Sequence, residues 1–168
     1  PACTSYPQIV HFSRATPVEV AGDPEWSLKV SVQNLENEWD DAVKGPRPGV
    51  LIAHEWTGLG KYVKSRPEQL AKLGYVAFCA DIYGKGVRAK DAGEAGKLAG
   101  KFKGDLPLLR SRGRAALDTL AKNPRVAAAR LFAMGYCFGG TAALELARSG
   151  APLAGTVSFH GGLSTKDP

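Results

Sequence analysis

One cysteine in this sequence lies in a setting that would make it a nucleophile. Cys137 is the third residue of GYCFGG, residues 135–140, a G-x-C-x-G-G sequence between a short apolar run and a helical pattern. A turn from strand to helix at this point is so tight that side chains at Gly135 and Gly139 would collide with neighbouring backbone. The reactive atom of Cys137 is then expected to project into the open.

A helix predicted over Thr141–Arg148 begins directly after this turn. The partial positive charge of a helix N-terminus favours thiolate over thiol, and the free N–H groups there can stabilise a tetrahedral oxyanion. The pattern therefore favours attack by Cys137 on a carbonyl group. A buried cysteine in a glycine-rich turn is the alternative, although alanine would meet the packing needs of such a turn equally well.

The elements that must hold this turn are typical of a parallel sheet covered by helices on both faces. From Gly49 onward, short apolar runs alternate with longer helical stretches. Strands are predicted at 50–53, 75–80, 131–134 and 156–159, and helices at 61–73, 91–102, 106–122 and 141–148. The expected fold class is α/β, a three-layer sandwich with a mostly parallel sheet.

Residues 1–48 differ from the rest of the chain, because they are rich in proline and turn residues. Their one good strand pattern is Ser27–Gln33, where apolar and polar residues alternate. We expect this strand to be an antiparallel neighbour at a sheet edge. Residues 1–168 then form a single domain, with an edge-strand and loop region over 1–48 and a parallel α/β core over 49–163.

Three motifs in combination resemble the dienelactone hydrolase family. They are GYCFGG at 135–140, HEWTG at 54–58 after the first parallel strand, and DIYG at 81–84 after the second. The resemblance covers about residues 49–163. It implies a sandwich of the α/β-hydrolase type that cleaves a small carboxylic ester or lactone. It implies no metal and no organic cofactor.

The resemblance can be carried over one position at a time. Cys137 matches the nucleophile that forms the acyl-enzyme, and the backbone N–H groups of Trp56 and Phe138 match the two donors of the oxyanion hole. Glu55 matches a glutamate that contacts the resting thiol and helps to generate the thiolate as substrate binds. A carboxylate beside a thiol can hold its proton until a substrate displaces the contact. A solvated loop position is the alternative for Glu55.

Further residues are predicted to lie at the substrate pocket. Tyr83 matches a pocket tyrosine, and Lys85 stands where dienelactone-specific members have an arginine that grips the substrate carboxylate. A lysine offers one compact charge where an arginine offers a bidentate fork, and Arg88 could supply that fork. His160 follows the last predicted strand and is interpreted as a pocket-lining or loop residue, with a substitute base as the alternative. His54 is expected at a strand end, facing the pocket or packed beneath it.

The base and the acid of a hydrolase triad are not recognisable in this sequence. In the family they are a histidine and an aspartate on loops after later strands, whereas this chain ends at Pro168, soon after the strand predicted at 156–159. The last strands of the fold are therefore expected on a companion C-terminal chain, or on a segment lost by cleavage or truncation. A stand-alone chain that has lost hydrolysis is the third explanation. The rival function is a non-catalytic binding module or an inactive fragment.

Composition excludes several other classes of protein. The chain has 168 residues, 44% of them hydrophobic and 23% charged, which suits one compact domain. No run of about 18 uncharged apolar residues is present, so no membrane span is expected. The net charge is +6, and the Lys- and Arg-rich stretch 85–114 has helical spacing with Phe102 as its single aromatic residue. This predicts a solvated helix face, with a basic nucleic-acid binder as the weaker alternative.

Three widely spaced cysteines without a C-x-x-C pair argue against a disulfide framework or a structural zinc site. A reducing cytoplasm fits this pattern best. The chain starts at Pro1 rather than Met, so its compartment is inferred from the cysteines alone.

Overall fold

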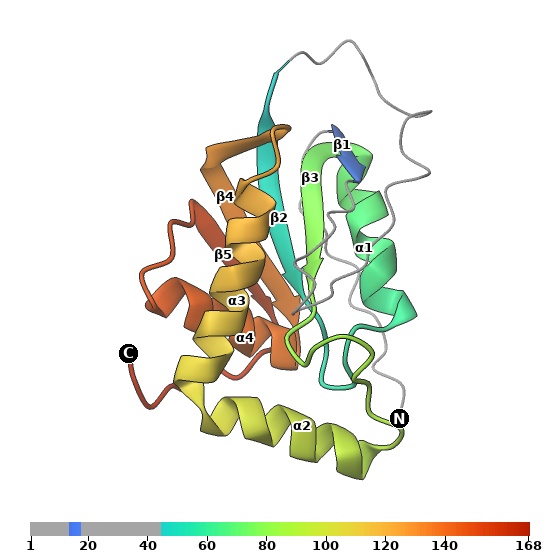
Figure 1. Ribbon diagram of the computed structural model, residues 1–168, viewed down its shortest axis with the longest axis vertical. Coiled ribbons are helices and arrows are strands. Elements are labelled where there is room, and N and C mark those ends of the chain that lie inside the picture. The colour runs from blue at the N-terminus through green and yellow to red at the C-terminus, as the bar shows by residue number, and fades with distance from the viewer. Residues whose placement is uncertain (1–13, 18–44) are drawn as a thin grey trace.

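The computed structural model describes residues 14–17 and 45–168, and these form an α/β fold around one parallel sheet (Figure 1). The strands are β1 (Arg14–Pro17), β2 (Arg47–Ala53), β3 (Leu73–Ala80), β4 (Val126–Tyr136) and β5 (Gly155–Phe159). The helices are α1 (Lys61–Ala71), α2 (Ala92–Gly104), α3 (Leu106–Ala121) and α4 (Phe138–Arg148). The strand order is β1-β3-β2-β4-β5, and each described pairing is parallel. The predicted α/β class and parallel sheet are confirmed.

Two differences from the expected elements concern the strands. The predicted antiparallel strand Ser27–Gln33 lies outside the described residues, whereas β1, which was not predicted, pairs with β3. β4 begins at Val126, well before the predicted Leu131. The early part of β4 is held by a register-shifted pairing between Arg47 and Val126, which local sequence preference does not reveal.

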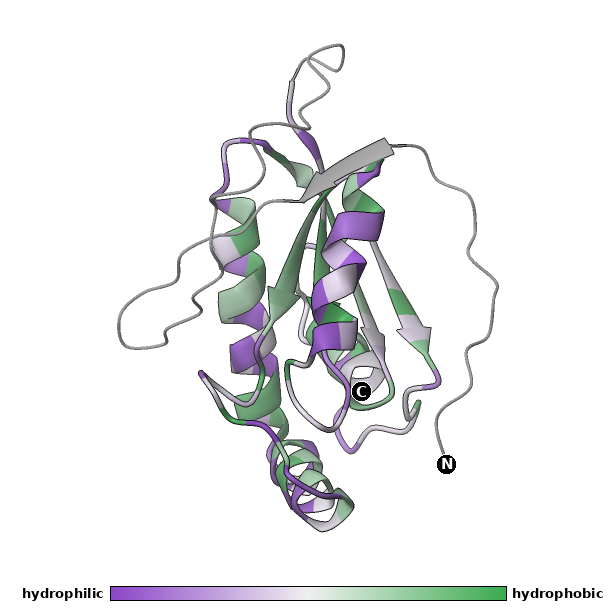
Figure 2. Cartoon of the chain, turned by 90° about the vertical axis from the view of Figure 1, so that its right-hand side faces the viewer, coloured by the Kyte–Doolittle hydropathy of each residue, from purple (hydrophilic) through white to green (hydrophobic). Residues whose placement is uncertain are grey.

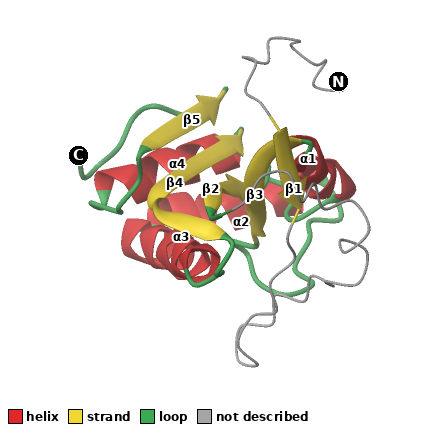
Figure 3. Ribbon diagram, turned by 90° about the horizontal axis from the view of Figure 1, so that it is seen from above, coloured by secondary structure: helices red, strands yellow, loops and turns green. Residues whose placement is uncertain are grey.

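The helices cover the sheet on both faces. α1 packs against β3 and β1, while α3 packs on β2 and α4 lies against β4 and β5 (Figures 1 and 3). Apolar residues gather on the strands and on the inner sides of the helices, and hydrophilic residues lie on their outer sides (Figure 2). Since both faces are covered, the central strands are continuous apolar runs rather than alternating ones.

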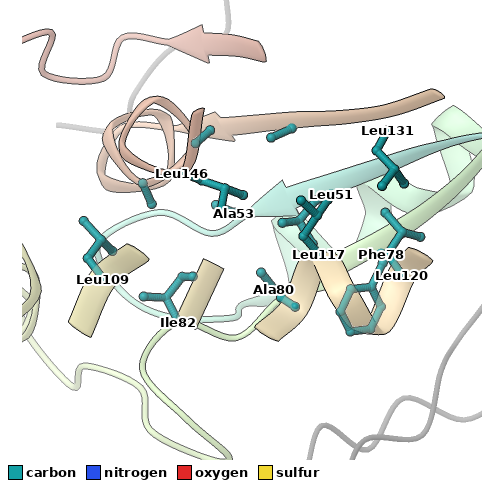
Figure 4. Close-up of a cluster of buried hydrophobic side chains, with 14 of the residues drawn as sticks. Leu51, Ala53, Phe78, Ala80, Ile82, Leu109, Leu117, Leu120, Leu131 and Leu146 are labelled. Atoms are coloured by element: carbon teal, nitrogen blue, oxygen red, sulfur yellow. The ribbon is translucent and has the colours of Figure 1, made fainter. Parts of the chain in front are cut away.

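The larger core cluster lies between the sheet and the helices α2, α3 and α4. Figure 4 shows Leu51 of β2 and Phe78 of β3 in this cluster, opposite leucines of α3. The inner side of α3 is buried at four positions, which have the spacing of one helix face: Leu109, Ala116, Leu117 and Leu120. A smaller cluster on the other face brings Val63 of α1 against Ile52.

A proline interrupts the hydrogen bonding of α1 at Pro67, which lies beyond the first turn of the helix. Proline has no N–H, so the carbonyl of Val63, four residues earlier, loses its helical partner. The Sγ of Cys79 lies 3.4 Å from that oxygen and donates a weak hydrogen bond to it. Burial raises the pKa of the Cys79 thiol to about 12, so the donor proton stays in place at neutral pH. Cys79 is thus a core residue with one added polar role.

A buried carboxylate fixes the segment that follows β5. Glu145 of α4 accepts hydrogen bonds from Arg110 (3.0 and 2.7 Å) and Arg148 (2.8 Å). Burial alone would raise the pKa of Glu145, but the hydrogen bonds that it accepts lower it below its usual range. The two arginines also reach Leu163 O and Asp167. The residues after β5 are therefore tied to α3 and α4.

Candidate active site

Cys137 lies in the turn between β4 and α4, at the edge of the sheet where the carboxyl ends of parallel strands place their sites. Its backbone angles are φ 54° and ψ −116°, a combination that residues other than glycine rarely adopt. Such strained positions persist only where the surrounding structure imposes them, and they cluster at functional sites. The thiol is free, and the residue is partly exposed rather than enclosed in the core.

The glycines around Cys137 are required by close backbone approach. A Cβ on Gly135 would lie 2.1 Å from Gly139 O, and a Cβ on Gly139 would lie 2.2 Å from Ala53 O. Both distances are far below any real carbon–oxygen contact, so neither position admits a side chain. The predicted collision with neighbouring backbone is confirmed.

The next strand and the free end of α4 complete this turn. The Cys137 N–H donates to Phe159 O at 2.9 Å, which ties the turn to β5. Phe138 is the first residue of α4, where a backbone N–H has no partner within the helix. No side chain caps this helix, whereas Asp91 and Asp105 cap α2 and α3. The N–H of Phe138 therefore remains available next to the thiol.

The loop after β2 carries the second predicted oxyanion donor, Trp56. A tight turn over 55–58 is closed by Gly58 N–H, which donates to Glu55 O at 3.1 Å, and Gly58 has φ +94°. The carbonyl of Thr57 accepts from Ala89 N–H at 3.1 Å, so the loop is also tied to the segment after β3. The Trp56 N–H donates to no other described residue, which leaves it available.

Tyr83 supports this loop from below. Its hydroxyl donates to Trp56 O at 2.9 Å, and its ring lies 5.1 Å from the ring of Phe138. The side chain is buried, and burial raises the pKa of Tyr83, with a further contribution from the nearby Cys137. The hydroxyl thus holds the loop, while its predicted contact with substrate stays a prediction.

His54 is packed beneath the site, one of the two placements expected for it. Its side chain is fully buried, with Nδ1 2.6 Å from Glu55 O and Nε2 accepting from Ile82 N–H at 3.2 Å. The ring stacks on Phe138 and meets Tyr83 edge-on. Burial lowers the pKa of His54 to about 4, so the ring is neutral at pH 7. A ring so enclosed cannot reach a substrate as a base.

A match to a protein-family model identifies the family of this chain. The model of the dienelactone hydrolase family matches residues 39–168. The chain belongs to the dienelactone hydrolase family. Among curated relatives, the chain is 30% identical over 119 residues to "Protein usf" of Aquifex pyrophilus, covering 68% of this chain and 51% of that protein. It is 34% identical over 121 residues to "Probable 2-oxo-3-(5-oxofuran-2-ylidene)propanoate lactonase" of Bradyrhizobium sp, covering 71% of this chain and 48% of that one.

Two solved structures support the same family. One is named m3DLH and has 46% identity and a TM-score of 0.71, over 75% of this chain and 52% of that one. The other is a dienelactone hydrolase-like promiscuous phosphotriesterase from metagenomic libraries, with 44% identity and a TM-score of 0.69, over 74% and 52% of the two chains. This dienelactone hydrolase family member therefore spans about half the length of the relatives that it matches.

The remaining predicted site residues of this family member lie on the segments that follow β2, β3 and β5, and they make no described hydrogen bond to Cys137. Glu55 is partly exposed on the β2 loop. Lys85 and Arg88 are exposed on the loop after β3. The Arg88 side chain lies close to the backbone before α1, because a Cβ built on Gly60 would be 3.2 Å from Arg88 Nη2. His160 is exposed just past β5, with φ 46°. Their roles toward substrate stay predictions.

The supporting roles of His54 and Tyr83 were not predicted. Their hydrogen bonds join residues 28 and 27 positions apart in the sequence, and so they leave no local pattern. Among the described residues, no group of three or more His, Cys, Asp or Glu side chains is placed to bind a metal ion. Nor does any helix of the described part have the length and apolar character needed to cross a membrane.

The buried His54 predicts a pH-dependent stability. The pKa of His54 is about 4 in the folded chain, whereas its ordinary value is 6.5. Between these two pH values the histidine is protonated in the unfolded chain and neutral in the folded chain. Stability therefore falls as the pH drops from 6.5 toward 4. The loss should reach roughly 2.5 kcal/mol at about pH 4.5, measured by urea unfolding at a series of pH values.

The variant His54→Asn is the control for this pH dependence, because it removes the titrating ring. Asp81, 3.8 Å from Nε2, works in the opposite direction, since burial raises its pKa and protonation then stabilises the fold. Glu145 has a lowered pKa, so its contribution to stability begins to be lost near its ordinary pKa of 4.5, at the acid end of this window, in the wild type and the variant alike. Equal pH slopes for the wild type and His54→Asn would show that the ring is not the titrating group.

Proposed function

We propose that this chain supplies the nucleophile and the oxyanion hole of a hydrolase for small carboxylic esters or lactones. The Sγ of Cys137 attacks the carbonyl carbon, and the N–H groups of Trp56 and Phe138 hold the oxyanion that forms. Collapse of this intermediate breaks the carbon–oxygen bond, and the alcohol leaves with a proton. Water then adds to the acyl-enzyme and releases the acid and the thiol.

One observation carries this proposal: a partly exposed cysteine held at φ 54° between two glycines that admit no side chain. A structural cysteine has no need of such strained backbone, because a core position is available in any strand, as Cys79 illustrates. The strain is explained if the turn serves to present the sulfur beside free N–H groups.

In the proposed mechanism, the groups that transfer protons lie partly on this chain and partly on a companion segment. By resemblance to the family, Glu55 is assigned to hold the thiol proton at rest until the substrate displaces it, a contact that the described hydrogen bonds do not include. The histidine that accepts the thiol proton and later activates water, with its aspartate, is assigned to a companion C-terminal segment. His54 is enclosed, and the family resemblance places the triad base after later strands.

The expected substrate is a small ester or lactone that carries a negative charge. Lys85 and Arg88 are exposed on the loop that packs against the Trp56 loop, where they would attract a carboxylate. One relative is named as a lactonase of a propanoate compound. A propanoate is an anion, which agrees with the negative charge expected for the substrate. The proposed compartment is the cytoplasm, and neither nucleic acid nor membrane is proposed as a partner.

Acylation by an activated ester tests the proposed function. Incubation with p-nitrophenyl acetate should release one equivalent of nitrophenol and leave one acetyl group per chain. This single acylation does not require the companion base, which is needed for turnover. Mass spectrometry of peptides should place that group on Cys137 and not on Cys79, whose thiol is buried. A chain that is folded yet gains no acetyl group at Cys137 would favour the non-catalytic binding module instead.

A further inference from the structure

We propose that His54 is a positioning residue that aims the Trp56 N–H at the oxyanion by gripping the opposite end of the same peptide unit. The inference rests on the proposed function, because it concerns the same oxyanion hole. It goes beyond that function by giving the buried histidine a part in transition-state stabilisation.

The peptide unit between Glu55 and Trp56 carries the oxyanion donor at one end and a carbonyl at the other. A trans peptide is planar and points its C=O and N–H in opposite directions, so fixing one end fixes the other. Glu55 O accepts hydrogen bonds from Gly58 N–H at 3.1 Å and from His54 Nδ1 at 2.6 Å. The shorter of these two contacts is made by a side chain.

The histidine ring is itself held from three directions. Its Nε2 accepts from Ile82 N–H, directly after β3, at 3.2 Å. The ring stacks on Phe138 with centroids 5.8 Å apart and meets Tyr83 edge-on at 4.6 Å. The ring therefore links the end of β3 and the first residue of α4 to the Trp56 loop.

These contacts select one tautomer of the ring. Ile82 N–H is a donor, so Nε2 must be the acceptor, and the single ring proton lies on Nδ1 and is donated to Glu55 O. The neutral ring is thus both acceptor and donor. No apolar side chain of similar shape could replace both contacts.

The orientation of this peptide decides whether an oxyanion is stabilised. In the observed orientation the carbonyl of Glu55 faces the histidine, and the N–H of Trp56 points to the other side. A reversed peptide would aim a carbonyl oxygen at the place of the developing negative charge and would withdraw the donor. Tyr83 holds the next carbonyl, Trp56 O, at 2.9 Å, so both peptide units flanking Trp56 are gripped by side chains.

Two reagents separate this role from a purely structural one. p-Nitrophenyl acetate reacts with Cys137 through a tetrahedral oxyanion, whereas iodoacetamide reacts by displacement at a saturated carbon and forms none. Both consume the same thiolate, so the ratio of the acylation rate constant to the alkylation rate constant reports the oxyanion hole alone. Each rate constant is followed on the Cys137 peptide by mass spectrometry, in the full chain.

Two variants of His54 give opposite expectations. His54→Phe keeps the ring contacts and removes both hydrogen bonds, so the ratio should fall about tenfold to a hundredfold, because the loss of one oxyanion donor costs about 10²–10³ in rate. His54→Asn places an N–H near the Nδ1 position and should restore the ratio to within about threefold of wild type. A ratio unchanged in His54→Phe, or equally low in both variants, overturns the inference.

A measurement on the unaltered chain keeps the inference testable if His54→Phe does not fold. A long-range proton–nitrogen spectrum at pH 7 should show a neutral His54 ring with its proton on Nδ1, and a proton on Nε2 would overturn the inference. Failure of the proposed function appears differently. In that case the wild type is alkylated at Cys137 but not acylated, whatever stands at position 54.

Discussion

Replacing Gly139 with alanine is expected to prevent the chain from folding to its native state. The added Cβ would lie 2.2 Å from the oxygen and 2.6 Å from the carbon of the Ala53 carbonyl, which is backbone of the central strand β2. Relief would require α4 to move away from the sheet and would open the larger core cluster. The cost should exceed about 4 kcal/mol, a large share of the roughly 5–15 kcal/mol that stabilises a typical domain. Soluble yield, circular dichroism and urea unfolding measure this loss.

The matched control for Gly139→Ala is Gly100→Ala in α2. A Cβ on Gly100 would meet nothing within 4 Å, and alanine is the better helix former by about 1 kcal/mol. The same chemical change should therefore raise the urea midpoint at one position and abolish the transition at the other. A Gly139→Ala variant with a wild-type midpoint would show that the turn is not as close to β2 as described.

Replacing Cys137 with alanine is expected to reduce acylation of the chain by p-nitrophenyl acetate at least about 10³-fold, because the attacking group is lost. The fold should be retained, since alanine meets the same positive φ as cysteine and the change removes one sulfur atom from a partly exposed residue. The other described thiol cannot take over. Burial raises the pKa of Cys79 to about 12, and its proton is donated to Val63 O. The release of nitrophenol and the mass of the chain give the two readouts.

Cys79→Ala is the matched control for the nucleophile. It removes a thiol of the same type from the core and should leave acylation at Cys137 unchanged. Its cost is the hydrogen bond to Val63 O, the carbonyl that Pro67 cannot satisfy, so a small drop in the urea midpoint is expected. Comparable acylation of Cys137→Ala and wild type would place the reaction elsewhere and remove the basis for the hydrolase proposal.

The fold was predictable where the signal is local and repeated. The central strands are apolar runs because both of their faces are covered, and the stripe of α3 that includes Leu109 and Leu117 has the period of a helix. The first half of β4 was not predictable in the same way. Its Ala-rich start has no strand preference, and it is extended because it pairs with β2 near Arg47.

The candidate site divides along the same line. The turn around Cys137 was predictable from its glycines, because their spacing encodes a steric requirement within one short segment. The hydrogen bond that His54 accepts from Ile82 and the one that Tyr83 donates to Trp56 were not, since each joins loops that follow different strands. A buried histidine and a buried tyrosine have many structural uses, and only their partners show that both hold the Trp56 loop.

The hydrogen bond from Cys137 N–H to Phe159 O limits where this polypeptide can be divided into two fragments whose reassembly would be read out by cysteine reactivity. The reactive turn is completed by the strand that follows it, and Gly162 N–H then donates to Thr141 Oγ1 of α4 at 3.0 Å. A cut placed before Gly155 would put Cys137 and Phe159 on different fragments. Reassembly would then have to restore both of these hydrogen bonds. A fragment that keeps the supported cysteine therefore has to extend at least to Leu163, whose carbonyl accepts a hydrogen bond from Arg148.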